Sequence, residues 1–122
     1  MWENAGVRIG HNESFDARIV RIALMREVSR EMADTWKDSP ALCTARMSSP
    51  LVRLEATEAM RRAGRGKQNK TPKLSEAYQW LFNREMEDAH TAMGDTRACQ
   101  EVYFGIQDLQ ARQVEAKAEF AV

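Results

Sequence analysis

Four stretches of the chain repeat apolar residues at regular spacing, and two of them lie in the N-terminal half. Residues 6–10, GVRIG, alternate apolar and other side chains and end in glycine, which predicts a short strand. In residues 15–32, FDARIVRIALMREVSREM, apolar side chains recur every three or four positions, which predicts one amphipathic helix. The expected core face of this helix consists of Phe15, Ile19, Val20, Ile22, Ala23 and Leu24.

Two more helices are predicted towards the C-terminus. The first follows Pro72, which suits a first helical turn, and is expected to end at Asn83. The second begins near residue 88 and runs to residue 110, and the tail at residues 110–122 is expected to extend it or to fray. The apolar residues at helical spacing are Leu74, Ala77, Tyr78, Leu81 and Phe82 in the first of these helices. In the second they are Cys99, Val102, Tyr103, Ile106 and Leu109.

The middle of the chain has weaker patterns. Pro40 ends the preceding helix, and residues 41–47, ALCTARM, are a weak candidate for a second short strand. Residues 61–73, RRAGRGKQNKTPK, contain no acidic side chain and are expected to form a mobile basic loop. Such a run is usually only solvated, and contact with phosphate groups is the alternative reading. The candidate phosphate contacts are Arg61, Arg62, Arg65, Lys67, Lys70 and Lys73.

Composition limits the class of protein. A chain of 122 residues with 43% apolar and 30% charged residues is expected to form a single domain, residues 1–122, with an ordinary globular balance. Eighteen basic residues match eighteen acidic ones, so no overall field favours a polyanionic partner. Cys43 and Cys99 are expected to be reduced and small buried residues. No apolar run approaches the roughly 20 residues that span a bilayer, and no signal peptide is visible, so no membrane and a cytoplasmic location are expected.

Two aspartates fall on the expected apolar faces. Asp16 lies four residues before Val20, and Asp95 lies four residues before Cys99. Because burial of an unpaired carboxylate is costly, each either has a cation or partner or lies at the edge of its stripe. His90 lies five residues before Asp95, a rotation of about 140° from it in a helix, so either the two residues are unrelated or His90 comes before the helix, on a loop or in its first turn, which the polar residues around it favour. A lone histidine is more often structural than catalytic.

These residues lie in segments that resemble a known family. HNESFDARIV resembles the second motif, and HTAMGDTRA the third motif, of the DEDDh 3′ to 5′ exonucleases, which are similar to the epsilon subunit of bacterial DNA polymerase III and to ribonuclease T. PKLSEAYQWLFN resembles the segment before the third motif, with Asn83 where glycine is usual. In this order the matches cover most of residues 8–106. The resemblance implies an α/β fold, a partial ribonuclease-H-like exonuclease fold that is mostly helical with one or two short strands.

The resemblance also implies a chemistry. In the family, four carboxylates hold two divalent cations for phosphodiester hydrolysis, and Mg²⁺ or Mn²⁺ suits such oxygen ligands. By the match, Asp16 and Asp95 are metal ligands and His90 is the general base. Asn12 supports the site by hydrogen bonding and Phe15 by packing. Cations between the two aspartates would account for their inward placement.

The sequence departs from the family in one respect. The first motif, an aspartate, one residue and a glutamate on the first strand, is absent from residues 1–10, where Glu3 stands alone. Two of the four carboxylates are therefore missing, and activity is expected to need them from another segment or chain. The strand at residues 6–10 would pair with the missing strand, so its edge and the apolar faces of two helices are expected to be uncovered, leaving the chain marginal or sticky.

Several readings remain open. The chain is the product of a truncated or interrupted frame, one half of a split enzyme, or a fragment that self-associates through the open edge. The expected partners are single-stranded DNA or 3′ ends, with an N-terminal half-domain or a polymerase. The alternative to an exonuclease is a non-catalytic nucleic-acid-binding or protein-interaction module that retains the scaffold, and a blander reading is a helical domain with chance matches.

Overall fold

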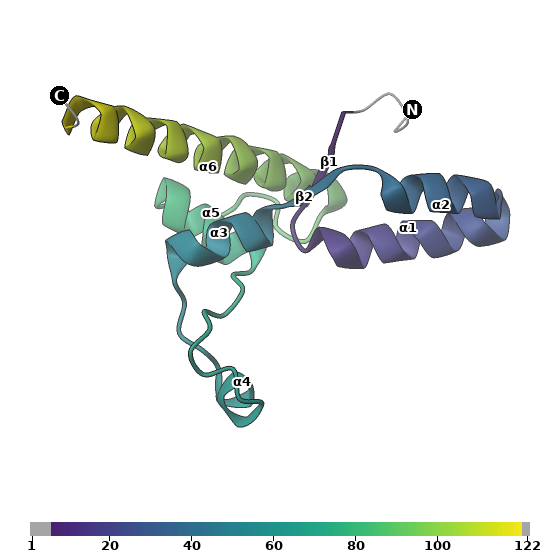
Figure 1. The fold of residues 1–122 in the computed structure, drawn as a ribbon, viewed down its shortest axis with the longest axis horizontal. Helices are drawn as coiled ribbons and strands as arrows, with labels where there is room; N and C mark the ends of the chain where they lie inside the picture. The colour runs from purple at the N-terminus through teal and green to yellow at the C-terminus, as the bar shows by residue number, and fades with distance from the viewer. Residues whose placement is uncertain (1–5, 121–122) are drawn as a thin grey trace.

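Two short parallel strands lie among six helices in the computed structural model, which describes residues 6–120 (Figure 1). The chain crosses from the first strand to the second through a pair of helices, and α6 runs along one side of the molecule. None of the helices in this described part is long and apolar enough to cross a membrane. In chain order the elements are β1 (Arg8–Gly10), α1 (Glu13–Glu27), α2 (Arg30–Asp38), β2 (Ala41–Cys43), α3 (Thr44–Val52), α4 (Glu58–Arg62), α5 (Leu74–Phe82) and α6 (Ala92–Phe120).

The sheet consists of β1 and β2 in the described chain. The strands pair in parallel, with Arg8 opposite Ala41, and the Arg8 N–H donates to the Pro40 carbonyl oxygen at 2.9 Å. Because alternate residues of a parallel strand bond to opposite neighbours, the peptide groups of Ile9 point to the other edge, where no described strand lies. The predicted strand at residues 6–10 is confirmed over Arg8–Gly10, and no other strand of the described residues pairs with it besides β2.

The predicted second strand is only partly right. It covers Ala41–Cys43, and the chain then turns into α3 at Thr44. The sequence did not indicate α3, because Pro50 lies inside it and its serines break the apolar spacing. Arg53 ends this helix in the left-handed conformation, with φ of 55°.

The single helix predicted over residues 15–32 is wrong. The chain forms two helices, with a break at Val28 and Ser29. The Ser29 hydroxyl accepts a hydrogen bond from the Met32 N–H at 3.1 Å, so it caps the start of α2. Apolar residues continue at helical spacing across the break, which is why the sequence indicated one helix. Ser29, a residue type that often begins a helix, was the sign of the break.

The predicted core face of α1 is also wrong. Phe15, Ile19 and Ile22 expose 57%, 51% and 47% of their surface, and α1 has no buried residue. The helix packs beside α2 (Figure 1) through a face on which Ala17, Arg21 and Leu24 are half-buried. Of the predicted core face, Leu24 alone belongs to it. The apolar face stays uncovered because no element of the described chain lies over it, as the absence of a further strand predicted.

The core forms between α3, α5 and α6, as the predicted stripes of α5 and α6 require. Tyr78 of α5 is buried against Val102 and Ile106 of α6. The two helices approach closely at Gly105, where an added Cβ would lie 3.1 Å from the Phe82 ring. The tail is helical through Phe120, and residues 121–122 lie outside the described part. The remaining members of this core and its border are Ala77, Ala98, Met47, Leu51, Leu74, Leu81, Phe82 and Met86.

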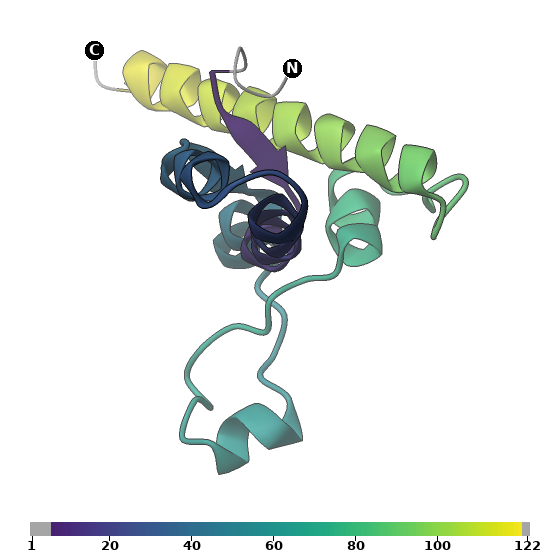
Figure 2. The same ribbon diagram turned by 90° about the vertical axis from the view of Figure 1, so that its right-hand side faces the viewer.

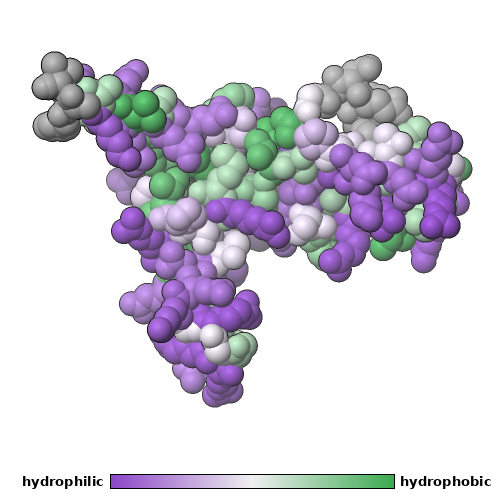
Figure 3. All heavy atoms as spheres, viewed as in Figure 1, coloured by the Kyte–Doolittle hydropathy of each residue, from purple (hydrophilic) through white to green (hydrophobic). Residues whose placement is uncertain are grey.

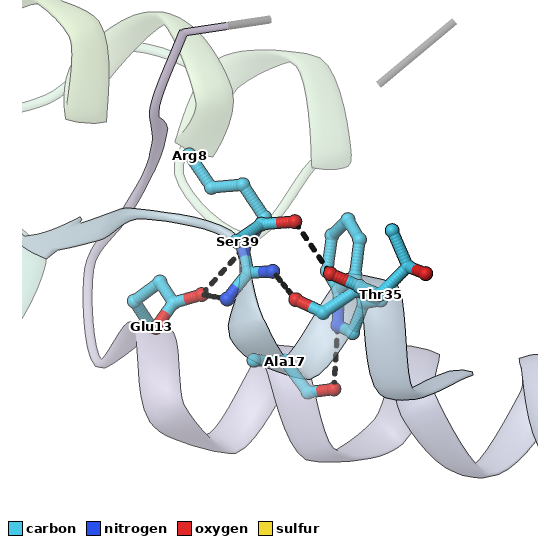
Figure 4. A network of polar contacts seen from close by, with 6 residues as sticks. Arg8, Glu13, Ala17, Thr35 and Ser39 are labelled. Atoms are coloured by element: carbon cyan, nitrogen blue, oxygen red, sulfur yellow. Dashed lines mark hydrogen bonds and ion pairs between the residues drawn. The ribbon is translucent and has the colours of Figure 1, made fainter. Parts of the chain in front are cut away.

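A polar network fastens α1 to its neighbours (Figure 4). The Arg8 guanidinium lies over the Trp36 ring, with Cζ 4.0 Å from the centroid, and donates to the Trp36 carbonyl oxygen. It also pairs with Glu13 of α1 at 3.0 Å. The Trp36 indole N–H donates to the Ala17 carbonyl oxygen at 2.9 Å. These contacts hold β1, α1 and α2 together around the Arg8 and Trp36 side chains.

Residues 54–70, called the arm from here on, project from the body on the side away from α6 (Figures 1 and 2). The ends of the arm are joined by a bridge between Leu54 and Lys70. The expectation of an irregular loop is partly wrong, because Arg61 and Arg62 belong to α4. The Pro72 side chain is fully buried where the chain returns from the arm to the body.

Candidate active site

Asp16 and Asp95 line one pocket of about 810 Å³. The pocket lies between the end of β1, the first turn of α1 and the first half of α6, so the fold brings together two carboxylates that are far apart in the sequence. Asp16 is exposed and Asp95 is half-buried, which leaves the pocket open to solvent. The other lining residues are Ile9, Gly10, His11, Leu74, Thr96, Cys99, Gln100, Tyr103 and Phe104.

Asp16 occupies the first turn of α1 together with Glu13. Acidic side chains are favourable there because the unpaired N–H groups of a helix start carry partial positive charge. The interior placement predicted for Asp16 is wrong, since the stripe that it continues faces solvent. Its position therefore needs no cation to offset burial, although the carboxylate remains free to bind one.

Asp95 lies in the first turn of α6 and binds the loop that precedes the helix. Its Oδ1 accepts a hydrogen bond from the His90 N–H at 3.2 Å. The Thr91 hydroxyl accepts from the Gly94 N–H at 3.0 Å and so satisfies another N–H of this turn. A carboxylate has about four lone-pair positions, so one N–H leaves capacity for a cation.

His90 lies before α6, as predicted, and its side chain is exposed. Its φ of 70° and the 52° of Asp88 are left-handed, which costs a residue other than glycine about 1 kcal/mol. Gly94 is required beside them, because an added Cβ would overlap the Asp88 carbonyl oxygen and lie 2.6 Å from Thr91 Oγ1. The close packing of this turn fixes the loop, and with it the position of His90 beside Asp95.

The two predicted supporting residues have other roles in the structure. Asn12 adopts the left-handed conformation, with φ of 60°, and its carbonyl oxygen accepts from the Phe15 N–H at 3.1 Å. Its side chain makes no capping hydrogen bond to α1. The Phe15 ring does not pack into the site, since it is 57% exposed and does not line the pocket.

The sequence did not reveal the role of His11. Its Nε2 lies 2.8 Å from the Pro72 carbonyl oxygen, which only accepts, so Nε2 carries the proton. Nδ1 therefore accepts from the buried Thr44 hydroxyl at 2.9 Å. Burial lowers the pKa of His11 below 6.5, against the opposing effect of the Pro72 hydrogen bond. His11 thus ties the pocket wall to α3 and to the segment before α5.

Cys99 extends this network on the α6 side. Its Sγ lies 3.7 Å from Thr44 Oγ1, and burial raises the pKa of the thiol. Both cysteines are free thiols and half-buried rather than fully buried. A protonated thiol is a poor ligand for a hard cation, which leaves the aspartates as the metal-binding candidates of the pocket.

The basic candidates do not gather at the pocket. Arg61, Arg62, Arg65 and Lys67 lie on the arm, on the other side of the body from α6 (Figure 2). Lys70 pairs with Glu76 at 3.0 Å. Lys73 is the residue before α5, and its N–H donates to Glu76 Oε1 at 3.0 Å. These two lysines therefore help to define the start of α5.

The donor set of the pocket is small. Among the described residues, no group of three or more histidine, cysteine, aspartate or glutamate side chains is placed to hold a metal ion. Two carboxylates are too few to hold two cations, and a single hard cation in this pocket would take most of its ligands from water or substrate. Glu3, the one acidic residue of the N-terminal stretch before the strand, lies outside the described residues.

Comparisons with protein-family models, with curated proteins and with solved structures find no match to this chain. The assignment of the site therefore depends on the residues and their geometry.

Proposed function

We propose that the pocket of Asp16 and Asp95 belongs to a metal-dependent nuclease that hydrolyses phosphodiester bonds at the 3′ ends of DNA. The observation that supports the proposal is that these two aspartates, from helices at opposite ends of the chain, line the same open pocket. His90 lies next to one of them through its hydrogen bond to Asp95. The three residues are those that the resemblance to the DEDDh exonucleases picks out.

Each residue has a distinct part in this proposal. Asp16 and Asp95 hold a divalent cation, which when bound supplies positive charge to the scissile phosphate and activates water. His90 accepts the proton of the attacking water in this proposal, because it lies beside Asp95 on the loop before α6 and its side chain is exposed. Tyr103 and Phe104 line the same pocket and offer apolar faces against which the terminal base stacks.

Two carboxylates are too few for the complete reaction centre. The proposal therefore includes further acidic ligands from outside the described residues, on another segment or another chain. Such a segment has a place to bind, because the edge of β1 beside the pocket is open. The small donor set also favours the alternative function, a nucleic-acid-binding module that keeps the scaffold without catalysis.

Metal binding is tested with Mn²⁺ and with single carboxylate replacements. Mn²⁺ at a concentration on the order of 1 mM is expected to raise the melting temperature of the wild-type chain, because two carboxylates form a weak site. Asp16→Asn and Asp95→Asn should each abolish the rise. Asp108→Asn is the matched control, since Asp108 lies on α6 and pairs with Arg112 on the exposed surface, and it should keep the rise.

Hydrolysis is tested by the Mn²⁺-dependent release of nucleotides from a 3′-labelled oligonucleotide, with the segment that supplies the missing ligands added where it is known. His90→Gln is expected to keep the Mn²⁺ effect on melting and to lose about 10²-fold or more in rate. If the chain binds Mn²⁺ but releases no nucleotides, the nuclease proposal is rejected and the non-catalytic nucleic-acid-binding module is favoured. A melting temperature that Mn²⁺ does not change in wild type would reject the metal site itself.

A further inference from the structure

The neutral net charge of the chain conceals an uneven distribution. The arm carries five basic and two acidic side chains, a net charge of +3. Because the whole chain is formally neutral, the rest of it carries −3. Figure 3 shows the arm as a mainly hydrophilic projection. A local positive field therefore exists on the arm although the chain as a whole has no net charge.

The arm is a defined structure rather than a loose run of charge. The Lys70 N–H donates to the Leu54 carbonyl oxygen at 3.0 Å and closes its base. The Thr57 hydroxyl accepts from the Met60 N–H at 3.2 Å and caps α4. After α4 the chain turns at Gly64, whose φ is 80°, and the Arg65 N–H donates to the Met60 carbonyl oxygen at 2.8 Å. These contacts hold the basic side chains on one protruding element.

The basic side chains of the arm are available to a ligand. Every residue from 61 to 69 is exposed. Glu58 lies 3.7 Å from both Arg61 and Arg62, and exposed ion pairs of this kind are weak, so they exchange readily for a phosphate. The side chains that we assign to binding are Arg61, Arg62, Arg65 and Lys67.

We propose that the arm binds the phosphodiester backbone of a nucleic acid, without regard to base sequence and independently of the aspartate pocket. Arginine forms two parallel hydrogen bonds to one phosphate, which favours phosphate over a simple negative surface. Gln68 and Asn69 add exposed polar groups of the kind that contact phosphates. A membrane surface fits less well, because Leu54 and Met60, the large apolar side chains of the arm, are half-buried and cannot insert.

The position of the arm separates this site from the pocket. The arm extends from the side of the body opposite α6, whereas the pocket is lined by α6 (Figure 2). A nucleic acid on the arm is therefore anchored away from Asp16 and Asp95. The inference does not depend on the proposed nuclease, and binding is expected to persist in Asp16→Asn and Asp95→Asn.

The test compares two quadruple variants that remove equal charge. Binding to fluorescein-labelled single-stranded DNA, duplex DNA and RNA of scrambled sequence is measured by anisotropy over a range of salt concentrations, and melting temperature checks folding. The arm variant carries Arg61→Gln, Arg62→Gln, Arg65→Gln and Lys67→Gln. The control variant carries Arg18→Gln, Arg26→Gln, Arg30→Gln and Lys37→Gln, four exposed positions on α1 and α2 or at their ends.

The wild type should bind with log K falling linearly against log salt. Each lost phosphate contact should reduce that slope by about 0.7 to 0.9, so the arm variant, which loses four contacts, should lose about 2.8 to 3.6 units of slope and bind at least about tenfold more weakly at low salt. The control variant should keep both slope and affinity nearly unchanged. Comparison of the DNA and RNA ligands then identifies which of the two supplies the backbone.

A deletion provides an independent check. Replacing residues 55–69 by Asn-Gly should close the base of the arm as a tight turn between Leu54 and Lys70, and it should abolish binding while the melting temperature is retained. Equal weakening in the arm and control variants would overturn the proposal, since it would reflect net charge alone. Tighter binding to anionic vesicles than to any oligonucleotide would overturn it as well.

Discussion

His11 is held at both ring nitrogens, and the Pro72 carbonyl oxygen, which only accepts, places a proton on Nε2. Nε2 donates to the Pro72 carbonyl oxygen and Nδ1 accepts from the Thr44 hydroxyl. A doubly protonated ring would make Nδ1 a donor, and the Thr44 hydroxyl would then have to accept from it and turn its own proton to another acceptor, such as the Gly10 carbonyl oxygen at 3.4 Å. This change to a longer hydrogen bond disfavours the charged ring. The burial that lowers the pKa of His11 acts in the same direction. The neutral ring is therefore part of the folded pocket wall.

This residue predicts a pH dependence of stability. The folded pKa lies below the ordinary value of 6.5, so the unfolded chain takes up the proton first as the pH falls. The free energy of unfolding should then decrease below about pH 6.5, by at most about 1.4 kcal/mol per pH unit. His11→Gln should flatten this decrease. Urea unfolding at several pH values measures it, and an equal slope in both proteins would contradict the prediction.

Residue-level reasoning from the sequence identified some members of the site but not their environment. Asp16, Asp95 and His90 stood out through spacing and motif, and the first two do line one pocket. The exposure of Asp16 and the bonds of His11 could not be read in this way. Both depend on which distant segments lie nearby, and no local pattern contains that information.

At the level of elements, the position of Asp16 depends on how α1 is fixed to β1. Arg8 makes this connection through Glu13, and the Trp36 ring covers its guanidinium. The Arg8 and Glu13 side chains are only 13% and 14% exposed, so removal of one partner leaves the other poorly solvated. The orientation of the carboxylate thus rests on contacts outside the pocket.

Arg8→Met should lower the free energy of unfolding by about 2 kcal/mol, because it leaves Glu13 without its partner in a partly buried place. It should also weaken the Mn²⁺ effect on melting, since α1 loses its anchor. Arg18→Met, at an exposed position of α1, should change stability by less than about 0.5 kcal/mol. Chemical denaturation measures both, and equal losses in the two variants would show that Arg8 is not the anchor.

Elements with a clear apolar stripe and distinct ends were predicted well. The helices α5 and α6 and the strand β1 follow their stripes, and Asn83 ends α5 in the left-handed conformation. The break between α1 and α2 was missed because the apolar period runs through it. Helix α3 was missed because packing of Thr44, Ala45 and Ser48, rather than a stripe of large apolar residues, defines its buried side.

The whole molecule exposes more surface than its size requires. Its accessible area is 9316 Å², whereas a compact monomer of 13.9 kDa is expected to expose about 6,700 Å². The protruding arm and the long α6 account for part of the excess. Exposed apolar side chains add to it, among them Ile9 of β1, Phe15, Ile19 and Ile22 of α1, and Phe104 of α6. Surfaces of this kind mark places where another chain or segment binds.

The uncovered face of α1 predicts self-association of the isolated chain. Phe15→Lys combined with Ile19→Lys should reduce association and change the stability of the monomer by less than about 0.5 kcal/mol, because neither side chain is buried. Met93→Lys combined with Val114→Lys is the matched control on α6, where these residues are 62% and 67% exposed. Sedimentation velocity at several concentrations measures association. Equal association in wild type and in the α1 variant would exclude this face.

The sequence by itself determined which segments become helices where an apolar stripe is present, and it singled out two aspartates and a histidine. Only the tertiary structure decided that Asp16 and Asp95 share a pocket, that the apolar face of α1 is left uncovered, and that the basic residues stand on an arm away from that pocket. The physical reason is that periodicity reports which face of an element avoids water. What covers that face, and which charges lie opposite it, depends on packing between segments that are distant in the chain.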